Sequence, residues 1–272
     1  MATETLPTGL AEKLKELAAR DDPRRLERDP VGLVRAARDK EAAALVAASL
    51  AFGNAKGIRA SVGRALEALE GDRRALRGFR HRWIGERELR RLFDGIERAR
   101  DLDGSLEATF RGGHEEVGPA LDAFCTRLRG PRPGRSLRFL LPRPADGSAC
   151  KRPLLFLRWV VRGDDGVDLG LWRHPAPAQL IVPLDTHVRR IAYWIGLTDR
   201  HDASWRTAVD VTESLRVIDP RDPVRFDFAL AHLGILKECP KEPVQRLCTR
   251  CPLNSYCRVW QGEGRRGSIG CN

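Results

Sequence analysis

Four of the seven cysteines lie close together late in the chain, at a spacing suited to a metal centre. They form the pattern Cys-x8-Cys-x2-Cys-x5-Cys, made by Cys239, Cys248, Cys251 and Cys257. A secreted disulfide framework would spread its cysteines more evenly, so we expect thiolate ligands in a reducing compartment. Zinc and a [4Fe–4S] cluster both accept four thiolates. Structural zinc sites commonly use two Cys-x2-Cys pairs, so the single pair here favours the iron–sulfur cluster, with zinc as the alternative.

The second chemical feature is positive charge. Lysine and arginine number 48 against 37 aspartates and glutamates, and the net charge of +11 favours an anionic polymer as partner. Between Cys125 and Pro144 the chain carries several arginines and no acidic residue. Such a run is commonly just a solvated surface. This one brackets the turn-rich segment at 141–151, which is expected to meet the backbone of the anionic polymer, so we expect phosphate contacts from Arg132, Arg135, Arg138 and Arg143.

Helices must position these residues, because helical spacing recurs along the chain while strand-like alternation is nearly absent. Leu10, Leu14 and Leu17 show this spacing, and Asp-Pro pairs supply an N-cap followed by a residue suited to the first helical position. No apolar run approaches the roughly 20 residues of a membrane-spanning helix. We predict an all-α protein with helices at 9–20, 30–52, 58–70, 85–100, 103–112, 115–129, 149–162, 185–196, 203–217 and 222–238.

We expect the helices to form two lobes. A central lobe over 45–162 would be accompanied by a second lobe built from 1–44 and 163–272, which holds the cysteine loop. Two segments rich in proline and glycine, 130–148 and 163–183, interrupt the helices. The Gly/Arg-rich tail at 262–272 is expected to be disordered.

Two motifs resemble the endonuclease III and adenine glycosylase branch of the helix-hairpin-helix (HhH-GPD) DNA glycosylase superfamily. One is Phe-Ala-Leu-Ala-His-Leu-Gly-Ile-Leu-Lys-Glu-Cys at 228–239, followed by the other three cysteines. The second is Val-Pro-Leu-Asp-Thr-His-Val-Arg-Arg at 182–190, which is similar to the family's Val-Asp-Thr-His segment with its catalytic aspartate. The clear resemblance covers about 180–260. It implies a two-lobed all-α glycosylase fold whose C-terminal loop holds a [4Fe–4S] cluster.

The resemblance is weaker upstream. Leu-Ala-Phe-Gly-Asn-Ala at 50–55 stands where the family has a loop that inserts into opened duplex, so the resemblance implies a DNA contact by Asn54. The family's hairpin, Leu-Pro-Gly-Val-Gly, is replaced by Leu-Pro-Arg-Pro-Ala-Asp-Gly-Ser-Ala-Cys-Lys at 141–151. The last residue, Lys151, matches the lysine that follows the hairpin in bifunctional members. Because the hairpin is remodelled, substrate choice does not carry over from the family.

Base excision breaks the C1′–N bond and develops positive charge on the sugar, which calls for a carboxylate and a nucleophile. Asp185 would stabilise that charge or deprotonate the nucleophile, although an aspartate before a helix commonly only caps it. Lys151 can form a Schiff base, which arginine cannot. Its alternative role is phosphate binding, and Lys56 is the weaker candidate nucleophile. His187 could orient the site or bond within its own helical turn.

Other residues carry a structural interpretation beside a functional one. Trp172 is a candidate for stacking on the extruded base, although tryptophan is more often a core residue. Cys150 is better explained as a small buried side chain than as a nucleophile. Asp164, Asp165 and Asp168 could suggest a cation site, but Gly-Asp-Asp-Gly is more simply a turn.

The sequence therefore predicts a DNA glycosylase of base excision repair with associated AP lyase activity through Lys151. Its partner would be double-stranded DNA with a damaged or modified base, held in the groove between the lobes. We expect a cytoplasmic, nucleoid-associated monomer that binds no membrane, since the first residues show no secretory signal. Two alternatives stay open: a monofunctional glycosylase in which Asp185 activates water, and a noncatalytic nucleic-acid-binding protein of the same fold.

Overall fold

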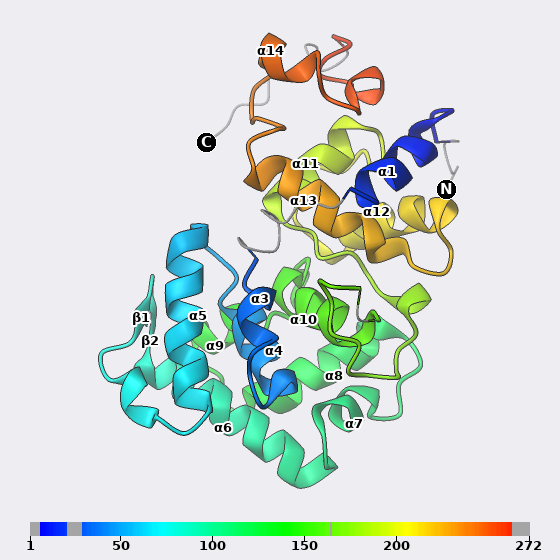
Figure 1. Ribbon diagram of the computed structural model, residues 1–272. Helices are drawn as coiled ribbons and strands as arrows, with labels where there is room; N and C mark the ends of the chain where they lie inside the picture. The colour runs from blue at the N-terminus through cyan, green and yellow to red at the C-terminus, as the bar shows by residue number, and fades with distance from the viewer. Residues whose placement is uncertain (1–5, 21–28, 164, 263–272) are drawn as a thin grey trace. The chain divides into compact units, whose positions relative to one another are not determined.

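The computed structural model describes residues 6–20, 29–163 and 165–262 (Figure 1). Within these ranges the chain is mostly helical, with one two-stranded antiparallel hairpin, so the prediction of an all-α protein is confirmed. Asp164 and all but the first residue of the tail predicted at 262–272 lie outside the described residues. None of the helices in the described parts of the chain has both the length and the apolar composition needed to cross a bilayer.

The chain divides into two compact units. The central unit is Asp22–Ile181, and the terminal unit joins Met1–Asp21 to Val182–Asn272. These boundaries differ from the predicted ones, because 22–44 and 163–181 belong with the central helices rather than with the cysteine loop.

Two hydrogen bonds explain why both segments belong to the central unit. The Trp172 indole Nε1 donates to the Glu41 carboxylate at 2.8 Å, and the Arg35 guanidinium donates to the Asp168 carbonyl oxygen at 2.8 Å. Each bond joins the chain at or just before the first turn of α4 (Lys40–Ser49) to the loop after α10 (Lys151–Val161). Helical periodicity carries no sign of such a pairing, because the partners stand more than a hundred residues apart.

The central unit contains most of the helices and the hairpin. In chain order its elements are α3 (Val31–Val34), α4 (Lys40–Ser49), α5 (Ala55–Leu69), η1 (Arg73–Leu76), β1 (Arg80–His81), β2 (Ile84–Gly85), α6 (Glu86–Asp103), α7 (Leu106–Arg111), α8 (Val117–Arg129), α9 (Arg135–Leu140), η2 (Pro144–Asp146), α10 (Lys151–Val161) and η3 (Pro177–Gln179). The hairpin pairs Arg80 with Gly85 and His81 with Ile84.

Helices α4 and α10 form the centre of this unit. From Ala42 to Ser49 every residue of α4 is buried, and the small side chains of its Lys-Glu-Ala-Ala-Ala-Leu-Val-Ala-Ala-Ser sequence let neighbouring helices approach closely. Helix α10 packs against it and buries Phe156 and Trp159 completely. Lys151 is the first residue of α10, so it is held in place by a helix that is buried from Pro153 to Val161.

The single helix predicted at 30–52 is wrong, because the structure has two helices there. Helix α3 ends at Val34, and Asp39 begins α4 as an N-cap whose side chain accepts from the Ala42 N–H at 3.1 Å. The same carboxylate pairs with the Arg100 guanidinium from α6. The hydrogen bond from Arg100 lowers the pKa of Asp39 and so keeps its carboxylate charged. Because the charged carboxylate is fixed as the N-cap of α4, a new helix start at Asp39 is favoured over one continuous helix.

The terminal unit contains the candidate catalytic aspartate and the cysteine loop. Its elements are α1 (Leu10–Ala18), α11 (Thr186–Trp194), α12 (Trp205–Ile218), η4 (Pro223–Phe226), α13 (Asp227–Ile235), α14 (Gln245–Cys248) and η5 (Asn254–Tyr256). Helices α11 and α13 pack on each other (Figure 1). Gly234 of α13 permits this approach, since a Cβ there would overlap the His187 imidazole.

Candidate functional site

The four clustered cysteines line a single pocket in the terminal unit. The pocket is bounded by Trp194, Glu238, Cys239, Pro240, Pro243, Cys248, Cys251, Asn254, Cys257, Val259 and Trp260. The cavity between these side chains is small, about 30 Å³, and is partly open to solvent. The pocket therefore gathers the four cysteines at one place.

The clustered cysteines carry free thiols in the described chain. Among the described residues, no three of the Cys, His, Asp and Glu side chains lie close enough to share one metal ion. None of the described cysteines is in a disulfide. Four free thiols around one pocket can serve as the ligand set of a shared metal centre.

Arg190 of α11 supplies positive charge beside the cysteine pocket. Its Nη2 donates to the Cys239 carbonyl oxygen at 2.7 Å, and its guanidinium carbon lies 4.9 Å from the centre of the Trp194 ring. Burial raises the pKa of the Cys239 thiol to about 11, and Arg190 acts in the opposite direction by favouring the thiolate. The second motif contains Arg190, so the sequence held a signal for this residue, but we predicted no role for it.

Two backbone hydrogen bonds attach the cysteine loop to the helices beneath it. The Cys239 N–H donates to the Leu233 carbonyl of α13 at 2.7 Å, and the Arg258 N–H donates to the Trp194 carbonyl at the end of α11 at 2.7 Å. Between these bonds, neither α14 nor η5 contains a buried residue, and Leu253 is the one buried apolar side chain among the described residues there, at 2% exposure. The loop is thus attached at both ends and has a small apolar anchor between them.

Asp185 is the N-cap of α11, as expected for an aspartate before a helix. Its Oδ1 accepts both capping hydrogen bonds, from the His187 N–H at 2.8 Å and the Val188 N–H at 2.7 Å. No described residue forms a hydrogen bond or ion pair with Oδ2, and the residue is partly exposed. One carboxylate oxygen therefore orients the side chain while the other can face a substrate.

His187 lies in the first turn of the same helix, packed on Gly234. Its imidazole is partly buried between α11 and α13. This position supports a structural role for His187 in the contact between α11 and α13. It is also compatible with a role in orienting Asp185, because the His187 N–H donates to the Asp185 carboxylate. Asp185, His187 and the cysteines all belong to the terminal unit.

Lys151 belongs to the central unit, as the first residue of α10. Its Nζ donates to the Ala51 carbonyl oxygen at 3.0 Å, and the side chain is partly exposed. This bond joins Lys151 to the 50–55 loop, where Asn54 caps α5 by accepting from the Gly57 N–H at 2.8 Å. The structure thus brings together two features that the sequence placed almost one hundred residues apart.

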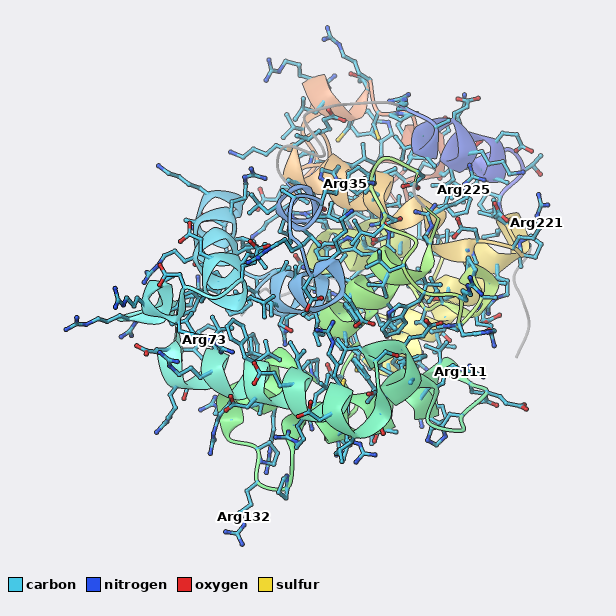
Figure 2. All side chains as sticks on the ribbon, turned by 60° about the horizontal axis from the view of Figure 1, so that its bottom comes forward. Arg35, Arg73, Arg111, Arg132, Arg221 and Arg225 are labelled. Carbon is cyan, nitrogen blue, oxygen red and sulfur yellow. The ribbon has the colours of Figure 1, made fainter. Side chains whose placement is uncertain are left out.

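The predicted phosphate-binding arginines fall into two groups. Arg132, Arg135 and Arg138 are exposed, and no described residue pairs with their side chains. Figure 2 shows Arg132 projecting away from the ribbon. Arg143 differs, because it pairs with Asp146 at 3.0 Å and with Asp122 at 3.7 Å. Its charge is already balanced within the protein, which makes it a poorer phosphate ligand than the other three.

Trp172 is a core residue, so its assignment to DNA binding does not agree with the structure. It is only 5% exposed, and its ring lies 5.2 Å from Phe156 and 5.7 Å from Phe110 between centroids. A base stacked on this ring would have to displace core side chains. In the loop that carries it, Leu169 is buried as well, whereas Leu171 is exposed.

The remaining acidic and cysteine candidates have structural roles in the described chain. Asp165 Oδ1 accepts from the N–H groups of Val167 and Asp168, which confirms a turn at this place. Asp168 is fully buried in an ion pair with Arg158 at 3.2 Å. Cys150 is also fully buried, and burial raises the pKa of its thiol to about 12, so it is no nucleophile at neutral pH.

One surface feature was missed by the sequence reasoning: a group of aromatic rings beside Lys151. Phe52, Trp83 and Phe139 contact one another in the central unit, and the Arg152 guanidinium packs on two of them. The segment Arg-His-Arg-Trp-Ile-Gly, which places tryptophan between cations and a turn, was the available signal.

A family model described as "Protein of unknown function (DUF2400)" matches residues 29–236. No curated protein and no solved structure matches the chain. The matched range contains both Lys151 and Asp185 and ends before the first of the clustered cysteines. Because the match covers well over half of the sequence, the chain belongs to the DUF2400 family.

Proposed function

We propose that the protein is a DNA glycosylase that cleaves the N-glycosidic bond of a damaged or modified base. The observation that carries this proposal is the carboxylate of Asp185, in which Oδ1 accepts two hydrogen bonds and Oδ2 accepts none from the described residues. It lies at the N-terminus of α11, and the C-terminal end of α11 borders the cysteine pocket. The motifs at 182–190 and 228–239 resemble those of endonuclease III-type glycosylases and add independent support. The net charge of +11 is consistent with a nucleic-acid substrate.

In this proposal Asp185 supplies a fixed negative charge to the sugar. Excision removes electrons from C1′ as the bond to the base breaks, so a carboxylate aimed at the sugar lowers the barrier. Two hydrogen bonds to Oδ1 orient the side chain before substrate arrives, and Oδ2 keeps its lone pairs for the reacting centre. A carboxylate that did not have to reorganise during the reaction would stabilise the transition state most effectively.

Lys151 is the proposed nucleophile of an associated AP lyase activity. Its amine would attack C1′ and form an imine with the opened sugar, a step that arginine cannot perform. The bond to the Ala51 carbonyl orients the ammonium group, which must lose a proton before it attacks. If Lys151 only binds phosphate, the enzyme is monofunctional and Asp185 activates a water molecule instead.

We propose a [4Fe–4S] cluster as the resident cofactor, held by Cys239, Cys248, Cys251 and Cys257. The position of all four cysteines on one pocket and the cation of Arg190 beside Cys239 support it. When bound, the cluster would cross-link a loop that has little apolar core of its own. Zinc is the alternative, and it would change the cofactor without changing the reaction.

The direct test is a panel of duplex and single-stranded oligonucleotides, each carrying one altered base, scored for abasic sites. Wild-type protein should release at least one base, and Asp185→Asn should not. Borohydride present during turnover should trap a protein–DNA adduct with wild type and none with Lys151→Gln. Base release without trapping would support the monofunctional enzyme. Tight DNA binding with no release from any oligonucleotide would support the noncatalytic nucleic-acid-binding protein.

A further inference from the structure

Three aromatic rings form an open cluster on the surface of the central unit. The ring centroids of Phe52 and Trp83 lie 5.4 Å apart, and Phe139 lies 4.9 Å from each of them. Trp83 is 52% exposed at the turn between β1 and β2. We call Phe52, Trp83 and Phe139 the aromatic platform. An exposed indole packed on two other aromatic rings is typical of interaction sites, because exposing apolar surface is otherwise unfavourable.

The platform is held rigidly by a buried histidine. His81 is only 4% exposed, and its Nε2 donates to the Phe52 carbonyl at 2.8 Å while Nδ1 accepts from the Ser61 hydroxyl at 2.9 Å. Burial lowers the pKa of His81, which favours the neutral ring that this pair of bonds requires. The 50–55 loop and the hairpin are thereby locked together, so a ligand would meet rings that are already in place.

Uncompensated positive charge surrounds the platform. The guanidinium carbon of Arg152 lies 3.8 Å from the Phe139 centroid, and that of Arg82 lies 5.6 Å from the Trp83 centroid. Among the described residues no carboxylate pairs with Arg152, Arg82 or the neighbouring Arg80. Arg152 donates only to backbone carbonyls, including that of Leu140 at 3.4 Å. These cations can donate hydrogen bonds to phosphate oxygens.

We propose that the aromatic platform binds an unpaired nucleobase of an undamaged single strand, with the base stacked on Trp83 and the adjacent phosphates near Arg82 and Arg152. Aromatic rings with unpaired arginines are the combination that single-stranded nucleic-acid sites use, since stacking accepts any base and the cations follow the backbone. An apolar peptide would leave these charges without partners. The site needs no altered base and no bond cleavage, so it goes beyond the proposed glycosylase activity.

The location of the platform relative to Lys151 adds to this inference. Lys151 bonds to the carbonyl of Ala51, the residue directly before Phe52, and Arg152 directly follows Lys151. A strand stacked on Trp83 would therefore bind to the same loop that holds the amine of Lys151. The platform would favour DNA that is already open at this point.

The test is fluorescence anisotropy with a labelled oligothymidylate of twelve nucleotides that contains only normal bases. Trp83→Ala should weaken binding by roughly 5- to 150-fold, the range for losing one stacking contact, and Trp83→Phe should recover most of it. Leu102→Ala, which removes another exposed apolar side chain, should bind like wild type. Arg82→Ala should weaken binding and reduce the dependence of affinity on salt.

Circular dichroism of each variant would verify that an exposed substitution leaves the fold intact. Unchanged oligothymidylate affinity in folded Trp83→Ala would overturn the proposal and leave the platform as a contact for a protein partner. Weakening by Leu102→Ala equal to that of Trp83→Ala would also overturn it. Because the probe carries no altered base, either result is independent of whether the protein excises bases.

Discussion

Replacing Asp185 separates helix capping from catalysis, because the structure assigns both capping bonds to one oxygen. In Asp185→Asn the amide oxygen can take the place of Oδ1 and keep both bonds to α11, while the amide nitrogen replaces the unbonded Oδ2. The only stability lost is the attraction of the negative charge to the helix dipole, about 0.3–1 kcal/mol. Asp185→Ala loses the cap as well, which costs about 1 kcal/mol more and lowers Tm by roughly 2–4 °C.

Base excision should respond very differently from stability. Removing a fixed charge that faces the transition state costs roughly 10²- to 10³-fold in rate, so both Asp185 variants should lose excision to a similar extent. Ser204→Ala is the matched control, since Ser204 caps α12 in the same unit by accepting from the Thr207 N–H at 3.2 Å. It should lose about 1 kcal/mol of stability and keep full excision.

The assay combines thermal unfolding with single-turnover release of the base identified from the oligonucleotide panel. Single-turnover conditions report the chemical step, so slow product release cannot hide a change in it. Near-normal excision by Asp185→Asn would refute the reasoning, because it would mean that the aspartate only caps its helix. Loss of excision in Ser204→Ala would also count against it, since instability of the unit would then explain the Asp185 results.

Three further predictions follow from the packing, the cysteine pocket and the surface charge. Gly95→Ala should lower the free energy of unfolding by about 1–3 kcal/mol, because its Cβ would overlap a backbone carbonyl of α8. Gly63→Ala, inside α5 with open space around it, should raise that free energy by about 0.5–1 kcal/mol, and urea unfolding of the two variants checks the opposite signs. Anaerobically purified protein should contain iron and absorb broadly in the visible range, and Cys248→Ser should lose both; colourless protein with one zinc would contradict this. Replacing Arg135 and Arg138 by alanine should make the log–log dependence of DNA affinity on salt shallower by about 0.9 per lost phosphate contact, and an unchanged slope would place them away from DNA.

Most helices could be predicted from the sequence because their signals are local. The N-cap of α12 is Ser204, one residue before the observed start, and the helix predicted at 203–217 differs from it by two residues at most. Helix α9 was missed, since its six residues fit between Gly134 and Pro142 in a segment whose glycines and prolines argued against any helix. Short helices leave too few turns for periodicity to register.

The site was predictable to the extent that its residues act within their own segment. The capping role of Asp185 and the grouping of the four cysteines both follow from adjacent sequence. In the structure Asp185 caps α11 and the four cysteines line one pocket. Trp172 was predicted to stack on the extruded base, and its burial could not be foreseen because it depends on Phe110 and Phe156, which come from other helices. The aromatic platform was missed for the same reason, since its rings come from three separate segments.

The arginine run illustrates how folding changes the meaning of local composition. No acid lies between Cys125 and Pro144, yet Asp146, just outside this window, pairs with Arg143 at 3.0 Å and with Arg129 at 2.7 Å. These arginines, Arg143 first, lower the pKa of Asp146 to about 2, so the carboxylate is charged at neutral pH and cancels positive charge there. The cations left for phosphate are Arg132, Arg135 and Arg138. At about 0.9 per phosphate, replacing these three should reduce the salt slope by about 2.7. If replacing Arg143 as well reduces the slope by a further 0.9, DNA displaces Asp146 from it, and the hairpin segment itself must then contact the backbone.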